Sequence, residues 1–277
     1  MSECSHNCDT CSLDCGSKES NISKLKLGKN CSVKKIIGIA SGKGGVGKSF
    51  VTSLLAAGLQ KKGFKVGILD ADVLGPSIPK SFGIIDNQVV ADENNLMIPK
   101  ESRLGIKVMS ANLLLEDETE PIIYRGSLIS GMLQQFYQET KWGDLDFLFI
   151  DMPPGTGDVP LTVYQSVPID KVIIVTSPQS LVSMIVSKSI NMADKMDIDI
   201  LGVIENMSYV VCPNCDTKIE IFGKSEIEKV VDDNDTIVLA KLPMRVEYSK
   251  MVDEGMVEDI DIEELDSTIE KIAELVK

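Results

Sequence analysis

The sequence has few aromatic residues, little positive charge and almost no histidine. Aromatic residues make up 5% of its 277 residues, and the only histidine is His6. Its 28 lysines and arginines are outnumbered by 42 aspartates and glutamates, which gives a formal net charge of −14. A surface of this sign repels the phosphates of nucleic acids and of anionic lipids. We therefore expect neither a nucleic-acid partner nor a membrane partner.

Long apolar runs are also missing. No segment approaches the roughly 20 consecutive apolar residues that a membrane span requires. The N-terminal segment lacks a basic stretch followed by an apolar core, which is the pattern of a secretory signal. We therefore expect a cytoplasmic protein, and thiols stay reduced in that compartment.

The most informative stretch that is present is the run from Gly42 to Ser49, GKGGVGKS. It matches the phosphate-binding pattern G-x-x-x-x-G-K-[ST] and adds a second lysine, Lys43. Its glycines let backbone N–H groups point at phosphate oxygens. The Lys48 ammonium suits the outer phosphates, and the Ser49 hydroxyl can bind Mg2+. The whole loop is therefore predicted to bind a nucleoside triphosphate: Gly42, Lys43, Gly44, Gly45, Val46, Gly47, Lys48 and Ser49.

From Val33 onward, short apolar runs alternate with helical patterns. Predicted strands cover 33–40, 65–70, 106–110, 147–151, 172–176, 200–204 and 236–240, and predicted helices cover 50–62, 127–140, 179–195, 224–232 and 263–276. Most of these strands are continuously apolar, which is typical of parallel strands buried on both faces. The predicted fold is α/β, a doubly wound, mainly parallel sheet of the P-loop NTPase type with helices on both faces. Residues 83–104 are expected to form a small hairpin.

Carboxylates follow two predicted strands, at the sheet edge where ligands bind in such folds. Asp70 and Asp72 follow the second strand, and Asp151 ends the fourth before the loop PPGTG. Asp151 matches the strand-end carboxylate that holds Mg2+ in nucleotide-binding proteins. Asp72 is expected to hold Mg2+ or to position the attacking water. Asp70 would either do the same less directly or lie solvated in a turn.

Asn206 follows the sixth predicted strand. Its amide carries a donor and an acceptor, so it can bond the edge of an adenine base. A polar residue that caps the strand end is an equally good interpretation of this position.

Seven cysteines in a reduced compartment need an explanation. Four lie close together near the N-terminus (Cys4, Cys8, Cys11 and Cys15), two form the C-x-x-C Cys212-Pro213-Asn214-Cys215, and Cys31 stands alone. Such short spacing favours metal or iron–sulfur ligation over disulfides. Cys31 is expected to be a small, partly buried side chain near the first strand.

The C-x-x-C pair supplies half of a four-thiolate site. Residues after it, Thr217 to Phe222, are predicted to turn back as β structure. Two copies of the chain would bring two pairs together across a two-fold axis. We therefore favour metal–sulfur binding between subunits over zinc, and both over a disulfide.

The chain is predicted to divide in two. Residues 1–31 would form a Cys-rich extension that binds a metal or an iron–sulfur cluster through Cys4, Cys8, Cys11 and Cys15. Residues 32–277 would form the ATPase domain with the C-x-x-C site. The spacing of the N-terminal cysteines does not match the common ferredoxin pattern, which leaves a cluster and zinc as alternatives.

These motifs together resemble those of the Mrp/ApbC-type iron–sulfur cluster carrier ATPases, relatives of MinD, ParA and the nitrogenase iron protein. The resemblance covers residues 33 to about 260 and rests on Gly42–Ser49, the run DADVLGPS from Asp70, the segment Asp151–Asp158, and Cys212–Cys215. It implies a homodimer in which Lys43 reaches the partner's nucleotide. It also implies a [4Fe-4S] cluster bridged by Cys212 and Cys215 of both subunits.

By the same resemblance, Lys43, Lys48 and Asp72 would be catalytic. The Mg2+ site would consist of Ser49, Asp72 and Asp151, and Asn206 would contact adenine. The implied cofactors are ATP, Mg2+ and the [4Fe-4S] cluster, and the implied partners are a second copy of the chain, cluster donors and apo iron–sulfur acceptor proteins. The N-terminal cysteines resemble those of the eukaryotic cytosolic branch, although their spacing is shorter.

Two other functions compete with cluster transfer by an ATPase. One is ATP-driven electron transfer, as in the nitrogenase iron protein, but that protein draws its bridging cysteines from separate segments. The other is a ParA- or MinD-like positioning ATPase. The tail from Ile260 to Lys277 is periodic but acidic, which is the wrong sign for binding anionic lipid.

Overall fold

The computed structural model describes residues 24–73, 75, 77–84, 88–114, 126–179 and 182–277. Within them the chain forms one nine-stranded sheet. The strands are β1 (Ser32–Ala40), β2 (Val66–Asp70), β3 (Lys100–Glu101), β4 (Lys107–Ser110), β5 (Asp144–Asp151), β6 (Lys171–Thr176), β7 (Asp199–Val211), β8 (Lys218–Ile219) and β9 (Val238–Pro243).

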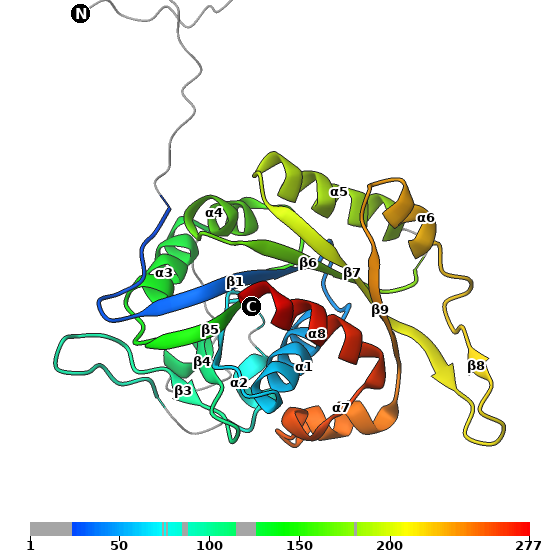
Figure 1. The fold of residues 1–277 in the computed structure, drawn as a ribbon, viewed down its shortest axis with the longest axis horizontal. Coiled ribbons are helices and arrows are strands. Elements are labelled where there is room, and N and C mark those ends of the chain that lie inside the picture. The colour runs from blue at the N-terminus through cyan, green and yellow to red at the C-terminus, as the bar shows by residue number, and fades with distance from the viewer. Residues whose placement is uncertain (1–23, 74, 76, 85–87, 115–125, 180–181) are drawn as a thin grey trace, which may run out of the picture.

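Helices cover both faces of this sheet (Figure 1). One face carries α1 (Lys48–Lys61), α2 (Ile78–Ser81), α7 (Val246–Asp253) and α8 (Asp266–Ala273). The other carries α3 (Gly126–Gln138), α4 (Asp158–Ser166), α5 (Val182–Lys195) and α6 (Ile227–Asp232). Short 3-10 helices lie at Ala111–Leu114, Val257–Asp259, Glu263–Leu265 and Glu274–Val276.

The strand order is β3-β4-β2-β5-β1-β6-β7-β8, and β9 also pairs with β7. Every pairing is parallel except β3 with β4 and β7 with β8. The central strands are apolar along nearly their whole length because helices cover them on both sides. The predicted doubly wound α/β fold is confirmed.

The seven predicted strands are all present, with shifted ends. β7 is the largest deviation, because it continues to Val211 and carries the chain out to the C-x-x-C segment. The sequence patterns missed α2, α4 and α7, which are short and begin beside glycine or proline-rich turns. In 83–104, the expected small hairpin is present among the described residues: Ala91 bridges Met97, the Asp92 N–H donates to the Leu96 carbonyl at 2.9 Å, and the Ile98 N–H donates to the Val90 carbonyl at 2.9 Å.

Residues 24–31 pack against the domain although they precede the first strand. Lys24 Nζ donates to the Tyr164 carbonyl oxygen at 2.6 Å, and the Leu25 N–H donates to the Ser166 carbonyl at 2.8 Å. Both acceptors belong to the last turn of α4. The four N-terminal cysteines Cys4, Cys8, Cys11 and Cys15 lie outside the described residues. Within the described part of the chain, no helix is both long enough and apolar enough to cross a membrane.

One contact between helices is made by two glycines. Gly255 follows α7 with φ +74°, and a Cβ placed on it would lie 2.5 Å from the Gly83 Cα, just after α2. A side chain on Gly255 would therefore require movement of the backbone, while a Cβ on Gly83 would lie 3.3 Å from the Gly255 carbonyl oxygen, at a φ of +69°.

We expect Gly255→Ala to lower the free energy of unfolding by about 1–3 kcal/mol, because it adds left-handed strain and a backbone clash. Gly131→Ala is the matched control, since its Cβ meets nothing within 4 Å in the middle of α3. That change should stabilise the helix by about 0.5–1 kcal/mol. Urea denaturation measures both, and equal effects would contradict the glycine contact.

Candidate functional site

The predicted phosphate loop joins the carboxyl end of β1 to the start of α1. Gly45 and Gly47 adopt φ of 78° and 79°, a region that residues with a Cβ rarely enter. A Cβ on Gly45 would meet nothing within 4 Å, so that side of the loop is open. A Cβ on Gly47 would lie 2.2 Å from Asn206 Nδ2. Gly45 thus leaves one face of the loop open to a ligand, and Gly47 allows Asn206 of β7 to approach the loop closely.

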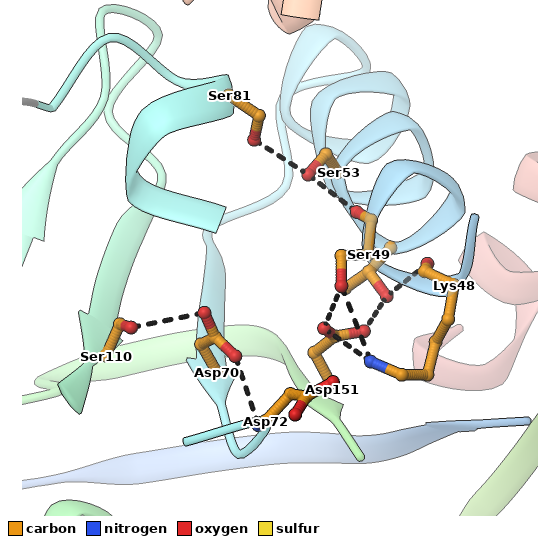
Figure 2. A network of polar contacts seen from close by, with 9 residues as sticks. Lys48, Ser49, Ser53, Asp70, Asp72, Ser81, Ser110 and Asp151 are labelled. Atoms are coloured by element: carbon orange, nitrogen blue, oxygen red, sulfur yellow. Dashed lines mark hydrogen bonds and ion pairs between the residues drawn. The ribbon is translucent and has the colours of Figure 1, made fainter. Parts of the chain in front are cut away.

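Asp151 is the centre of the polar network that Figure 2 shows. Its side chain is fully buried at the end of β5. Lys48 Nζ lies 2.7 Å from Oδ2, Ser49 Oγ donates to the same oxygen at 2.6 Å, and Thr52 Oγ1 donates to Oδ1 at 2.6 Å. All three donors come from the first turn and a half of α1. The network therefore fastens the phosphate loop and its helix to the strand-end carboxylate.

Asp70 and Asp72 lie beside this network at the end of β2. The Asp72 N–H donates to Asp70 Oδ1 at 3.1 Å, and the Ser110 hydroxyl donates to Oδ2 at 3.1 Å. Asp70 is 1% exposed, so the alternative of a solvated turn residue is wrong. Burial, together with the neighbouring Asp151 carboxylate, raises the pKa of Asp70 to about 8. Burial also raises the pKa of Asp72.

The three carboxylates lie close to one another in a largely buried position, and the positive charge of Lys48 lowers the pKa of Asp70 and Asp72 against the larger effect of burial. A divalent cation would supply further positive charge. Carboxylate and hydroxyl oxygens are also the donors that Mg2+ prefers. The donor set of Ser49, Asp72 and Asp151 therefore fits Mg2+.

The network continues from α1 to α2, the helix that follows Asp72. Ser53 Oγ donates to the Ser49 carbonyl at 2.8 Å and lies 3.4 Å from Ser81 Oγ (Figure 2). The segment after Asp72 is therefore in hydrogen-bond contact with the helix that leaves the phosphate loop.

Asn206 sits on β7 and is 3% exposed. Its Nδ2 donates to the Val46 carbonyl of the phosphate loop at 3.0 Å. It also lines a cavity of about 250 Å3 whose walls come from β7, α1 and the β9–α7 region: Gly47, Phe50, Asn206, Met207, Pro243, Met244, Arg245, Tyr248, Ser249 and Val252. A mostly apolar cavity of this kind, beside a phosphate loop, suits a flat heteroaromatic base.

Lys43, the second lysine, bonds a residue outside the Asp151 network. Its Nζ donates to the Gln179 side-chain oxygen in the loop before α5. A Cβ on the preceding Gly42 would collide with Ile185 of α5 at 1.9 Å. The first half of the loop is thus packed against the β6–α5 region, and the second half against β5.

Cys212 and Cys215 form the turn that joins β7 to β8, as the predicted turn-back requires. The Cys212 N–H donates to the Thr217 carbonyl at 3.0 Å, and Cys215 Sγ donates to Thr217 Oγ1 at 3.3 Å. When Cys215 ionises, its sulfur can accept hydrogen bonds from the Thr217 hydroxyl, the Thr217 N–H and the Cys212 thiol, and these lower the pKa of the Cys215 thiol. Cys212 is half-buried and Cys215 is exposed. Cys215 is therefore the more accessible of the two thiols and the one whose pKa is lowered.

The hairpin does not complete a metal site by itself. Among the described residues, no group of three or more His, Cys, Asp and Glu is placed to hold a metal ion. Two thiols on an exposed turn are what a site shared with another molecule would show.

The structure thus brings most predicted site residues together at one edge of the sheet and places Cys212 and Cys215 beyond it on a hairpin. Sequence reasoning missed Thr52 and Gln179. The first could have been found, since it lies one helical turn after Lys48. Nothing in the sequence marks Gln179, which reaches Lys43 through the packing of the β6–α5 loop.

The fold and the phosphate loop define a P-loop NTPase of the class with a second lysine in the loop. A family model described as ParA, NUBPL iron-transfer P-loop NTPase, matches residues 32–277. The chain belongs to this NUBPL iron-transfer family, as its motifs predicted.

Sequence relatives carry a consistent name. A protein of Clostridium perfringens named iron-sulfur cluster carrier protein is 44% identical over 91% of this chain and 90% of its own length. One of Methanocaldococcus jannaschii with the same name is 44% identical over 92% of this chain and 90% of its own length.

Solved structures agree on the fold. A nucleotide-binding protein from Archaeoglobus fulgidus in complex with ADP is 41% identical, covers 84% of this chain and 91% of its own, and superposes with a TM-score of 0.76. The cell division ATPase MinD of Pyrococcus furiosus, 20% identical, covers 88% and 98% with a TM-score of 0.61. The MinD likeness concerns the fold alone.

We expect Lys48→Met to lower the free energy of unfolding of the nucleotide-free protein by about 3 kcal/mol, because it leaves the buried Asp151 without its cation. Lys35→Met is the control: Lys35 pairs with Asp170 at 3.0 Å, and both side chains are about one-third exposed. Its loss should cost about 1 kcal/mol or less. Chemical denaturation compares them. If Lys48→Met lowered the free energy of unfolding as little as the control does, the hydroxyls of Ser49 and Thr52 alone would be enough to stabilise the buried Asp151 carboxylate.

Proposed function

We propose that this protein is an ATP-dependent carrier that binds a [4Fe-4S] cluster across a homodimer and transfers it to apo-proteins. The observation that carries the proposal is the course of β7. This one strand contacts the phosphate loop through Asn206 and ends in the accessible thiols of Cys212 and Cys215. The names of the relatives support cluster carriage, and the ADP complex of the Archaeoglobus protein supports nucleotide binding.

The residues divide the work of binding ATP. The backbone N–H groups of Gly44 to Ser49 would surround the phosphates, with the Lys48 ammonium turning from Asp151 toward the outer phosphate oxygens. The adenine would enter the 250 Å3 cavity beside Asn206. Because Asn206 Nδ2 is used by Val46, its oxygen remains to accept a hydrogen bond from the adenine amino group.

Ser49, Asp72 and Asp151 would hold Mg2+, which when bound neutralises phosphate charge during hydrolysis. Asp72 would orient the attacking water, since it lies at the open side of the network and is less buried than its neighbours. Lys43 would leave Gln179 and reach the phosphates bound by a second copy of the chain.

The cluster is cargo rather than a resident group. Two thiolates from each subunit would complete its four ligands. Exposed apolar side chains follow the cysteines on the same hairpin: Ile219, Ile221 and Phe222 are 50%, 54% and 40% exposed. Apolar surface of this kind is suited to a partner's copy of the same hairpin.

Cluster donors and apo acceptors would be the further partners, in the cytoplasm. The proposed division of the chain gives residues 1–31 a second metal or iron–sulfur site at Cys4, Cys8, Cys11 and Cys15. Residues 32–277 would act as the ATPase and carrier domain.

Anaerobic reconstitution with iron and sulfide tests the cluster site. In a chain whose four N-terminal cysteines are changed to serine, we expect about four iron atoms per two chains, as one [4Fe-4S] cluster needs. Cys212→Ala/Cys215→Ala should remove nearly all of it, and Cys31→Ser should not, since Cys31 packs against Thr140 and Gly143. Full iron content in the double variant would refute the site.

Asn206→Ala should weaken ATP binding by about tenfold, because it removes a hydrogen bond to the base and leaves the Val46 carbonyl unpaired. It should also reduce any preference for ATP over GTP. Asn234→Ala, whose amide bonds the Val230 carbonyl at 2.7 Å on α6, is the control and should bind ATP normally. Calorimetric titration decides between them. Unchanged ATP affinity in Asn206→Ala would contradict the placement of the adenine base in this cavity.

A further inference from the structure

Glu205 is a buried carboxylate that the proposed reaction does not use. It precedes Asn206 on β7 and is 1% exposed. Lys241 lies opposite it in the β7–β9 register but is paired with Glu228 instead. Burying a carboxylate costs several kcal/mol unless it is well bonded. The hydrogen bonds of Glu205 are therefore what allow it to be buried there.

Both carboxylate oxygens of Glu205 bond serine hydroxyls from different segments. Ser208 Oγ donates to Oε2 at 2.7 Å, and Ser225 Oγ donates to Oε1 at 2.5 Å. The Ser225 hydroxyl also accepts the Ile227 N–H at 3.2 Å, at the start of α6. The carboxylate thus joins β7 before Asn206, β7 after Asn206, and the segment that follows the cysteine hairpin.

The stretch that the carboxylate spans is irregular. From Glu205 to Tyr209, β7 advances four residues while β9 advances only two, from Lys241 to Pro243. Met207, in the middle, has φ +59°, a strained value for a residue with a side chain. Such bulges redirect side chains beside functional sites. Here the bulge turns Asn206 toward the phosphate loop and lets Met207 line the base cavity.

Only five residues separate Asn206 from Cys212, and they belong to the same strand (Figure 1). A change at the phosphate loop that moves Asn206 must therefore be absorbed in the bulge or reach the hairpin. The two extra residues allow the bulge to change its conformation. The Glu205 hydrogen bonds restrict that freedom, because they tie both sides of Met207 to the start of α6.

We propose that Glu205 is a positioning residue that couples nucleotide occupancy to the cysteine hairpin by holding the β7 bulge closed through Ser208 and Ser225. This inference rests on the proposed function, since it takes the phosphate loop as the nucleotide site and the hairpin as the cluster site. The inference adds that the nucleotide site acts on the cysteine hairpin through the β7 bulge.

Thiol alkylation in the cluster-free protein provides the test. The full chain carries serine at its other five cysteines, so that iodoacetamide reports on Cys212 and Cys215. We expect Mg-ADP or a non-hydrolysable Mg-ATP analogue to change the alkylation rate by about fivefold or more, the lower range for coupling between sites. The measured quantity is the ratio of rates with and without nucleotide, which a purely structural role would not alter.

Glu205→Leu should reduce that ratio to about twofold or less while nucleotide binding, measured by calorimetry, persists. Leucine keeps the volume and removes a buried charge, so the variant is expected to fold. Glu205→Gln should retain most of the ratio, because serine hydroxyls can both donate to and accept from the amide. Glu228→Gln, which removes only the exposed pair with Lys241, is the control. If Glu205→Leu does not fold, Ser225→Ala decides in its place.

An unchanged ratio in the folded variant would overturn the coupling, and so would the absence of any nucleotide effect in a parent that binds nucleotide. Failure of the parent to bind nucleotide at all would instead refute the proposed function. The two failures are therefore distinguishable.

Discussion

The buried carboxylate of Asp151 is the constraint on which the site depends. It lies at the end of β5 with no exposure, and such a charge persists only when fully bonded. α1 satisfies it with the Lys48 ammonium and the hydroxyls of Ser49 and Thr52. That requirement sets the position of the helix, and the helix sets the curvature of the phosphate loop before it. Nucleotide binding would compete for the same ammonium, so the ligand would alter the bond that orders its own site.

β7 connects the phosphate loop to the cysteine hairpin. A parallel strand normally ends at the ligand edge of the sheet, but this one passes the edge and continues into the β7–β8 hairpin. Asn206, which bonds the phosphate loop, and the thiols of Cys212 and Cys215 therefore follow one another closely along one backbone. A change at Asn206 could therefore alter the thiols without any domain movement, through a change in the backbone geometry of a few peptide groups.

Much of this was predictable because parallel strands and phosphate loops leave strong sequence patterns. Continuous apolar runs gave the central strands, and GKGGVGKS gave the loop. Asp151, Asn206 and the cysteines could be singled out as candidates because strand ends and short cysteine spacings are local signals. The bulge at Met207 and the pairing of Lys43 with Gln179 were not predictable, because both arise from packing between segments distant in the chain. The short helices α2, α4 and α7 lacked enough periodic residues to be recognised.

The meeting of Gly83 and Gly255 has a mechanical meaning. α7 lines the cavity through Tyr248 and Ser249, while Gly83 ends the segment that begins with Asp72. Because no side chain stands between the two backbones, there is no rotamer through which the contact can yield. A displacement of α7 by an occupant of the cavity would therefore reach α2 through direct contact between the two backbones. A base in the cavity would thus affect the segment that begins with Asp72, beside the phosphate end of the same nucleotide.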